Sequence, residues 1–295
     1  MNRTTGKIIK GVGGLYQVFV EGAGKIPCSA KGILRYRHVR PLIGDNAELL
    51  LPDGTHEGSL LSVLPRTNEL LRPAVANVDQ AMIVFAAREP EPHWNLLDRF
   101  LIRMQEQRVP VLICINKEDK ISEAERERIR TIYADSGHAL LFTQASAGVG
   151  MEAVRERLRG KTTVLAGPSG VGKSTILNFL LPEAEMETGE ISEKIRRGRH
   201  TTRHSELFHI EADTYLCDTP GFSSLYLPQM RPEELAGYYG EFAPYAGDCR
   251  FLGCRHRREP DCAVKEAVAA GRISKERYEN YLLLYEEVLH QKRYD

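Results

Sequence analysis

GPSGVGKS, at residues 167–174, matches every position of the phosphate-loop pattern G-x-x-x-x-G-K-[ST]. An apolar, strand-like run precedes it at Thr162–Ala166, and a helix-like run follows it from Ser174 to Leu181. A phosphate loop requires both neighbours, because it carries the chain from a buried strand into the N-terminus of a helix. The segment therefore predicts an α/β domain with a nucleotide-phosphate site.

The residue types in this loop suit a phosphate ligand. Glycines let backbone N–H groups turn toward phosphate oxygens, Lys173 would contact the β- and γ-phosphates, and the Ser174 hydroxyl would bind Mg²⁺. A nucleoside triphosphate with magnesium is therefore the expected ligand. The predicted phosphate-binding residues are Gly167, Pro168, Ser169, Gly170, Val171, Gly172, Lys173, Ser174 and Thr175.

The α/β rhythm extends from residue 73 to about residue 230. Apolar runs alternate there with helix-like segments, which indicates a largely parallel sheet. The apolar runs are Gln80–Ala86, Val109–Ile115, Ala139–Thr143, Thr162–Ala166 and Thr214–Cys217. The helix-like segments are Trp94–Gln107, Ser122–Ser136, which opens with a Ser122/Glu125 capping-box pattern, and Met151–Leu158.

A motif for reading guanine follows the apolar run that ends at Ile115. The tetrapeptide Asn116–Asp119 is similar to the one with which GTP-binding proteins recognise the base. The Asp119 carboxylate can accept hydrogen bonds from the N1–H and the exocyclic amine of guanine, donors that adenine does not offer in that arrangement. We therefore expect GTP to bind and ATP to be a poor substrate. The residues expected to read the base are Asn116, Lys117, Glu118, Asp119, Ser146 and Ala147.

Two further motifs would surround the γ-phosphate. Asp218-Thr219-Pro220-Gly221 resembles the GTPase segment in which the aspartate positions Mg²⁺ through water and the glycine amide senses the γ-phosphate. By the same resemblance, Thr202 supplies a hydroxyl for Mg²⁺. At position 222 many GTPases carry a water-orienting glutamine, but here the residue is Phe222, so slow intrinsic hydrolysis is expected. His200 is the nearest group in sequence that could orient the attacking water, and contact with RNA is the alternative role for it.

The order of these motifs is circularly permuted. Ordinary GTPases begin with the phosphate loop, whereas here Asn116 and Ser146 precede Gly167, and Thr202 and Asp218 follow it. A permutation preserves a site when the new termini fall at exposed positions. Because the segment after Asp218 now leads into the C-terminal region, we expect loss of the γ-phosphate to be transmitted there through the two switch segments.

Cysteine usage favours a metal site over disulfide bonds. One cluster has the spacing C-x4-C-x-H-x5-C and offers three thiolates and one imidazole, the complement of a closed structural Zn²⁺ site. Cys28, Cys114 and Cys217 instead stand singly in apolar stretches. The predicted zinc ligands are Cys249, Cys254, His256 and Cys262. Four arginines near them would form a phosphate-binding surface or merely a soluble basic one, namely Arg250, Arg255, Arg257 and Arg258.

Three domains are predicted, at residues 1–72, 73–230 and 231–295. The first contains β-prone runs at Leu15–Val20, Gly32–Tyr36 and Glu48–Leu51, which indicate a small, OB-like β-barrel. Its basic residues fit RNA binding or a solvated loop, and they are Lys31, Arg35, Arg37, His38 and Arg40. The third domain is mainly helical, and its last helix runs from Ser274 to about His290. The expected core face of that helix consists of Tyr278, Tyr281, Leu282, Tyr285, Val288 and Leu289.

Composition restricts the partners. The formal net charge is zero, so RNA would have to meet local basic patches such as KIRRGRHTTRH at residues 194–204. That patch lies in a predicted switch, so RNA affinity would depend on the bound nucleotide. No apolar run approaches the roughly 20 residues needed to span a bilayer, and no secretory signal is evident. We expect a cytoplasmic protein with no membrane partner.

With barrel, permuted GTPase motifs and cysteine cluster in this order, the whole chain resembles the bacterial RsgA family of GTPases that depend on the small ribosomal subunit. The resemblance implies binding to the small (30S) subunit and its rRNA late in maturation, GTP hydrolysis stimulated by the subunit, and release with GDP. It also implies a monomer with one structural Zn²⁺ and a catalytic histidine in the first switch, which matches His200.

Two other functions fit part of the sequence. One is a nucleotide-gated RNA-binding or translation-regulating switch in which hydrolysis is incidental. The other is an ATP-dependent small-molecule kinase, which leaves Asp119 and the cysteine cluster without a role. Turnover of GTP and ATP, measured with and without ribosomal subunits, distinguishes the three.

Overall fold

The computed structural model describes residues 2–36, 38–51, 57–71, 73–181, 205–218 and 226–291. The chain forms two compact units. The first consists of Met1–Met82, Ala145–Ala166 and Gly172–Phe222, and the second of Ile83–Gln144, Gly167–Val171 and Ser223–Asp295. The residues singled out in the sequence that lie outside the described residues are Arg37, the basic segment 194–204, which includes His200 and Thr202, and residues 219–222, which include Gly221 and Phe222.

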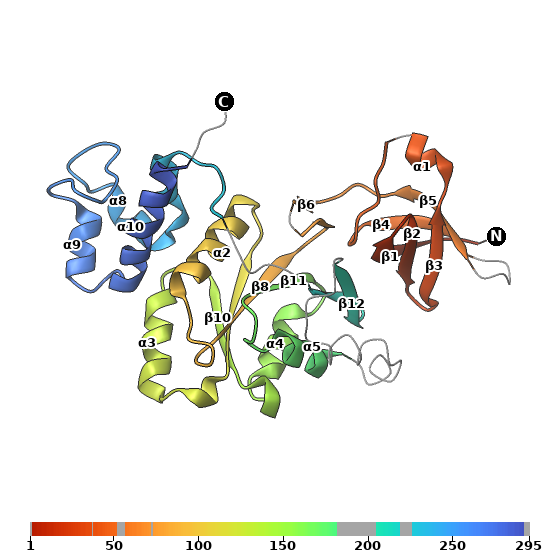
Figure 1. Cartoon of the computed structure of the whole chain (residues 1–295), viewed down its shortest axis with the longest axis horizontal. Helices are drawn as coiled ribbons and strands as arrows, with labels where there is room; N and C mark the ends of the chain where they lie inside the picture. Colours follow the sequence, from red (N-terminus) through yellow and green to blue (C-terminus); the bar gives the residue numbers. More distant parts are fainter. Residues whose placement is uncertain are drawn as a thin grey trace. The chain divides into compact units, whose positions relative to one another are not determined.

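The N-terminal strands close into a barrel with the order β1-β2-β3-β5-β4 (Figure 1, red and orange). Its strands are β1 (Arg3–Val12), β2 (Leu15–Val20), β3 (Gly24–Ala30), β4 (Asn46–Leu50) and β5 (Gly58–Val63). Ile8, Val18, Leu49 and Leu60 fill the interior and are fully buried. Alternate residues of each strand point inward, so these four apolar side chains form the barrel core. The predicted small β-barrel is confirmed.

The prediction of a strand at Gly32–Tyr36 was wrong, because this segment forms the short helix α1 (Gly32–Tyr36). The Leu34 N–H donates to the Lys31 carbonyl at 3.0 Å, and Leu34 packs into the barrel core. Tyr36 is 82% exposed. Strand propensity reflects packing on a half-buried surface, and a segment anchored by Leu34 lacks the alternation that a strand needs.

A six-stranded sheet has the order β10-β9-β8-β11-β13-β12. Its strands are β8 (Gln80–Ala86), β9 (Val111–Asn116), β10 (Ala139–Thr143), β11 (Thr162–Ala166), β12 (Glu206–Glu211) and β13 (Thr214–Asp218). β9 and β10 are parallel, as are β11 and β13, whereas β12 is antiparallel to β13. Every residue of β8, β9 and β11 is buried, which is typical of strands covered on both faces. The predicted α/β architecture is confirmed, although β12 was not predicted.

The helices of this region begin close to their predicted positions. They are α2 (Trp94–Glu106), α3 (Glu123–Tyr133), α4 (Met151–Leu158) and α5 (Lys173–Leu180). Ser122 caps α3, because its Oγ accepts the Glu125 N–H at 3.3 Å and the Glu125 carboxylate accepts the Ser122 N–H at 2.8 Å. This reciprocal pair is the predicted capping box. A separate two-stranded sheet consists of β6 (Glu69–Leu70) and β7 (Val75–Ala76).

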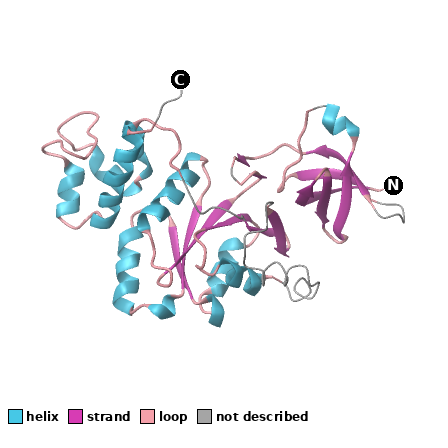
Figure 2. Cartoon of the chain, viewed as in Figure 1, coloured by secondary structure: helices cyan, strands magenta, loops and turns pink. Residues whose placement is uncertain are grey.

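Helices and loops make up residues 226–291, as Figure 2 shows. The elements are the 3₁₀ helices η3 (Pro232–Tyr238) and η4 (Gly240–Phe242) and the α-helices α8 (Ala243–Ala246), α9 (Ala263–Ala269) and α10 (Lys275–Leu289). In α10, Tyr281 and Tyr285 are buried as predicted, but Leu289 is 42% exposed and Leu284 is buried in its place. Leu289 is the last residue of the helix, where the packed core ends. None of the helices in the described part of the chain is long and apolar enough to cross a membrane.

A buried ion cluster joins α10 to α2 within the second unit. Arg277 is 2% exposed, and its Nε donates to Glu241 Oε1 at 2.7 Å while its Nη1 donates to Asp98 Oδ1. Asn280 Nδ2 donates to the other oxygen of Asp98 at 2.8 Å. Charges are rarely buried unless they are paired, so these contacts hold α10, η4 and α2 in one core.

Candidate functional site

The phosphate loop joins β11 to α5 and has the backbone that its glycines permit. Gly167, Gly170 and Gly172 have φ angles of +137°, +82° and +98°, which side-chain-bearing residues rarely adopt. Val171 is buried, whereas Ser174 and Thr175 are exposed at the start of α5. Free N–H groups at a helix N-terminus and in such a loop attract anions. The loop thus has the form that a phosphate ligand requires.

Asn116 brings the predicted guanine-reading segment to the phosphate loop. It ends β9, and its Nδ2 donates to the Val171 carbonyl at 2.9 Å, across 55 positions of sequence. Thr143 at the end of β10 donates from Oγ1 to Asn116 Oδ1 at 3.0 Å. Both amide atoms of this buried side chain are therefore paired. Asn116 and the Gly167–Val171 part of the phosphate loop therefore lie together in the second unit, although their order in the chain is inverted.

The base-reading residues occupy short turns after β9 and β10. Lys117 has a left-handed backbone with φ of +61°, and its Nζ donates to the Glu89 carbonyl. Asp119 is exposed in the 3₁₀ helix η1 (Glu118–Lys120), so its carboxylate is accessible to a ligand. Ser146 and Ala147 are exposed in the 3₁₀ helix η2 (Ala145–Ala147).

Lys173 and Asp218 belong to the first unit. β11 and β13 run parallel with Leu165 opposite Asp218, so Asp218 lies at the end of the sheet from which the chain enters the phosphate loop. Burial lowers the pKa of Lys173, and the negative charge of Asp218 opposes this shift. An anionic phosphate would act in the same direction as Asp218 and favour the ammonium form.

Three predicted site residues cannot be placed. His200, Thr202 and Gly221 lie outside the described residues, and so does the basic segment 194–204. The catalytic role of His200, the Mg²⁺ ligand role of Thr202, the γ-phosphate contact of Gly221 and the switch function of both segments therefore remain predictions.

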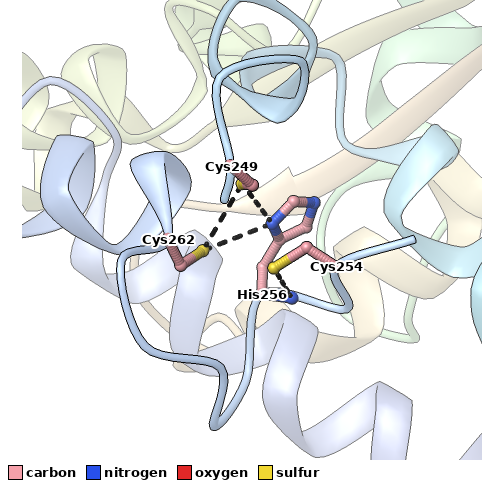
Figure 3. Close-up of side chains that lie close together, drawn as sticks. All are labelled: Cys249, Cys254, His256 and Cys262. Carbon is pink, nitrogen blue, oxygen red and sulfur yellow. Dashed lines mark hydrogen bonds between the residues drawn. The ribbon is translucent and has the colours of Figure 1, made fainter. Parts of the chain in front are cut away.

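The cysteine cluster is assembled as the spacing predicts (Figure 3). One ligand atom from each of Cys249, Cys254, His256 and Cys262 lies within 4.8 Å of the others. Cys249 Sγ is 3.8 Å from Cys262 Sγ and 3.5 Å from His256 Nδ1, which is 3.4 Å from Cys262 Sγ. The remaining cysteines, Cys28, Cys114 and Cys217, are free and buried.

These distances suit tetrahedral zinc. With Zn–S near 2.3 Å and Zn–N near 2.0 Å, ligand atoms at tetrahedral angles are about 3.8 Å apart for two sulfurs and about 3.5 Å apart for sulfur and nitrogen. Burial raises the pKa of the Cys254 thiol to about 12 and raises that of Cys262. A divalent cation among these sulfurs would favour the thiolates and offset that effect. The donor set and its geometry therefore fit a structural zinc ion.

Residues that the sequence did not assign to the cluster support it. Tyr278 and Tyr281 on α10 donate hydroxyl hydrogen bonds to the carbonyls of His256 and Arg255 at 2.7 and 2.6 Å. The Glu259 carboxylate accepts hydrogen bonds from the backbone N–H groups of Arg255, Arg257 and Arg258, which lie between the ligands. Burial would raise its pKa, but four backbone hydrogen bonds lower it to about 2. Two features of the sequence could have indicated these contacts. They are the aromatic face of the last predicted helix and Glu259, the only acid between Cys254 and Asp261.

Most arginines around the cluster are already paired. Arg250 lies 2.7 Å from Asp261, Arg255 lies 2.7 Å from Glu233, and Arg257 pairs with Glu286. Arg258 is exposed, and it has no ion-pair partner among the described residues. The predicted phosphate-binding surface thus contains less free positive charge than the count of arginines implies.

We expect Cys254→Ser to lose the metal and to open the loop from Cys249 to Cys262 without unfolding α10. The reason is that α10 also packs in an apolar core against Leu235 and Phe242, neither of which is a ligand of the cluster. The expected loss of unfolding free energy is about 2 kcal/mol. Metal content, thermal denaturation and hydrogen exchange measure these effects. Cys28→Ala, which removes a barrel thiol, is the control and should keep its metal; zinc retained by Cys254→Ser would contradict the assignment.

Comparisons with known proteins cover nearly the whole chain. The RsgA GTPase family model matches residues 63–228, and the RsgA N-terminal domain model matches residues 5–59. The protein named small ribosomal subunit biogenesis GTPase RsgA from Agathobacter rectalis is 48% identical over 98% of this chain and 100% of its own length. Its namesake from Alkaliphilus metalliredigens is 46% identical over 98% of this chain and 99% of its own length.

Two solved structures are similar over the same extent. The crystal structure of YjeQ from Thermotoga maritima has a TM-score of 0.79 at 34% identity and covers 99% of this chain and 100% of its own. The structure of YloQ, described as a circularly permuted GTPase, has a TM-score of 0.78 at 34% identity and covers 99% of this chain and 98% of its own. The similarity thus extends over the segments that form the barrel, the six-stranded sheet and the C-terminal helices of this chain.

Proposed function

Since this chain belongs to the RsgA family of circularly permuted GTPases, we propose that it binds the small ribosomal subunit late in maturation and hydrolyses GTP when the subunit stimulates it. It leaves the subunit with GDP bound. The relatives named above are small ribosomal subunit biogenesis GTPases, which supports this partner. The protein acts in the cytoplasm as a monomer, with its three domains at residues 1–72, 73–230 and 231–295.

One observation carries the nucleotide assignment, namely the 2.9 Å hydrogen bond from Asn116 to the Val171 carbonyl. It supports a single site at which Asp119 reads guanine while Lys173 contacts the β- and γ-phosphates. Ser146 and Ala147 contact the guanine carbonyl. Asp119 rejects adenine because that base would leave the carboxylate without its hydrogen-bond donors.

Ser174 and Thr202 are the proposed protein ligands of Mg²⁺, and Asp218 orients it through water. When bound, Mg²⁺ neutralises charge that develops on the β- and γ-phosphate oxygens. Gly221 senses the γ-phosphate through its N–H group. The exposed hydroxyl of Ser174 at the start of α5 fits this role.

The four-residue cysteine and histidine cluster holds one structural Zn²⁺, which stabilises the loop between Cys249 and Cys262. We place the rRNA contacts on the barrel, the basic segment 194–204 and Arg258. Lys31, His38 and Arg40 are exposed on the barrel, which suits this assignment. Such contacts neutralise phosphates, so subunit binding should weaken as salt is raised.

Turnover assays test the proposed function. We expect GTP hydrolysis to rise strongly when purified small subunits are added, and to change little with large subunits or free RNA. ATP should be hydrolysed poorly in every mixture. Phosphate release at saturating nucleotide is the measurement. Absence of stimulation by any ribosomal particle would favour an RNA-binding switch, and preference for ATP would favour a kinase.

His200→Ala is expected to leave GDP and GTP affinity within about twofold and to lower subunit-stimulated turnover by about a hundredfold or more. The reason is that Phe222 cannot orient the attacking water, and His200 is the nearest group in sequence that could do so. Nucleotide titration and stimulated phosphate release measure the two effects. Full stimulated turnover in this variant would assign His200 to RNA contact or to no role.

A further inference from the structure

Arg126 on α3 reaches back to the base-reading turn. Its Nε lies 3.4 Å from Oε2 of Glu118, the residue directly before Asp119. The Glu118 side chain is only 14% exposed. Both atoms are buried, and among the described residues neither has a hydrogen-bond partner. The ion pair is therefore the contact that offsets the burial of these two charged atoms.

The same arginine also contacts the second base-reading strand. Its guanidinium lies over the ring of Phe142 on β10, with the Cζ atom 5.0 Å from the ring centroid. Phe142 is buried and directly precedes Thr143, which bonds Asn116. Arg126 thus connects the turn that carries Asp119 with the strand that leads to Ser146.

Other contacts also hold the turn, since Lys117 Nζ donates to the Glu89 carbonyl and Arg88 Nη1 donates to the Lys120 carbonyl at 3.4 Å, but neither involves the side chain of Glu118 or Asp119. η1 is a three-residue 3₁₀ helix that follows the left-handed residue Lys117. Its backbone hydrogen bonds are those from Lys120 to Lys117 at 3.0 Å and from Ile121 to Glu118 at 3.3 Å. Glu118 points inward and Asp119 is exposed, so a shift of Glu118 would turn the Asp119 carboxylate. Hydrogen bonds weaken steeply with such misalignment.

We propose that Arg126 is a positioning residue for guanine recognition, holding Glu118 so that the Asp119 carboxylate meets the N1–H and amino groups of the base. The proposal rests on the proposed function, because it assumes that Asp119 binds guanine. Without Arg126, the Glu118 carboxylate would lose its ion-pair partner and repel the adjacent Asp119.

Arg130 provides a matched control. It also lies over Phe142, at 5.4 Å, but it pairs with Glu127 at 3.2 Å and makes no ion pair with Glu118 among the described residues. Arg126→Met and Arg130→Met remove the same charge from the same ring and helix. Only the first removes the Glu118 contact.

The experiment measures GDP and IDP dissociation constants by competition against a fluorescent guanine nucleotide, together with the melting temperature of each variant. IDP lacks the exocyclic amine, so its affinity does not report that hydrogen bond to Asp119. In Arg126→Met, GDP affinity should fall about tenfold and the preference for GDP over IDP should shrink accordingly. In Arg130→Met, the GDP affinity and the preference for GDP over IDP should each stay within about twofold of the wild-type values. Asp119→Ala should remove the preference entirely.

The possible failures are separable. If the wild-type chain does not prefer GDP over IDP, or Asp119→Ala keeps that preference, the proposed guanine site fails. If wild type prefers GDP and Asp119→Ala does not, but Arg126→Met keeps the full preference, the role of Arg126 is overturned and the site stands. Equal losses for GDP and IDP with a lower melting temperature would make Arg126 a structural residue and would also overturn the proposal.

Discussion

Gly167→Ala is expected to abolish nucleotide binding, with a loss of affinity of about a thousandfold or more. A Cβ atom on Gly167 would lie 2.0 Å from the Val84 carbonyl oxygen, and the φ angle there is +137°. That oxygen belongs to the backbone of the central strand β8, so it cannot move aside as a flexible side chain could. The loop must shift instead, which destroys the arrangement of N–H groups that would hold the phosphates.

Titration with GDP measures this effect, and thermal denaturation reports the accompanying strain of about 3–5 kcal/mol. Gly160→Ala is the matched control. Gly160 also has a positive φ, +67°, but nothing lies within 4 Å of an added Cβ. We expect it to lose about 1 kcal/mol of stability and to bind GDP normally. Normal GDP binding by Gly167→Ala would show that the described loop conformation is not the binding one.

Arg277→Met is expected to lower the free energy of unfolding by about 3–5 kcal/mol, because it leaves two buried carboxylates without their cation. Asp98 is fully buried and Glu241 is 5% exposed. Removing one partner of a buried ion pair is far more damaging than removing an exposed pair. Denaturant unfolding measures the change. The triple variant R277M/D98N/E241Q should recover much of the loss, because it leaves no unpaired charge.

The control for this prediction is Arg128→Met. Arg128 on α3 pairs with Glu276 on α10 at 2.8 Å, but its side chain is 69% exposed. Its loss should change stability by less than about 1 kcal/mol. Equal effects of the two substitutions would mean that the buried cluster contributes no more than a surface pair.

The stability of Arg277→Met should also depend on pH. Burial raises the pKa of Asp98, and Arg277 opposes this shift in the wild-type chain. Without the arginine, the pKa in the folded state rises further above its value in the unfolded chain. The folded variant then binds more protons than the unfolded one, so its stability falls as pH rises through that interval. The deficit relative to wild type should be smaller near about pH 5 than near about pH 8.

Much of the fold follows from local patterns. The Ser122/Glu125 capping box, the β2 strand at Leu15–Val20 and the α4 helix at Met151–Leu158 occur where the sequence predicted them. Each depends on contacts within a few residues or on a clear periodicity. Gly32–Tyr36 and Leu289 were mispredicted because their state depends on whether a neighbouring element covers them.

The residues by themselves determined the chemistry of the ligand. A complete phosphate loop, the Asn116–Asp119 tetrapeptide and the cysteine spacing have few other uses, since backbone N–H groups, a carboxylate and thiolates each suit a narrow class of ligand. Only the tertiary structure decided which distant polar residues meet in the folded chain. Asn116 meets Val171 across 55 positions and Arg277 meets Asp98 across 179, and no periodicity encodes such partners. The physical reason is that a buried polar group must find its partner wherever the packed chain brings one, and that depends on the whole fold.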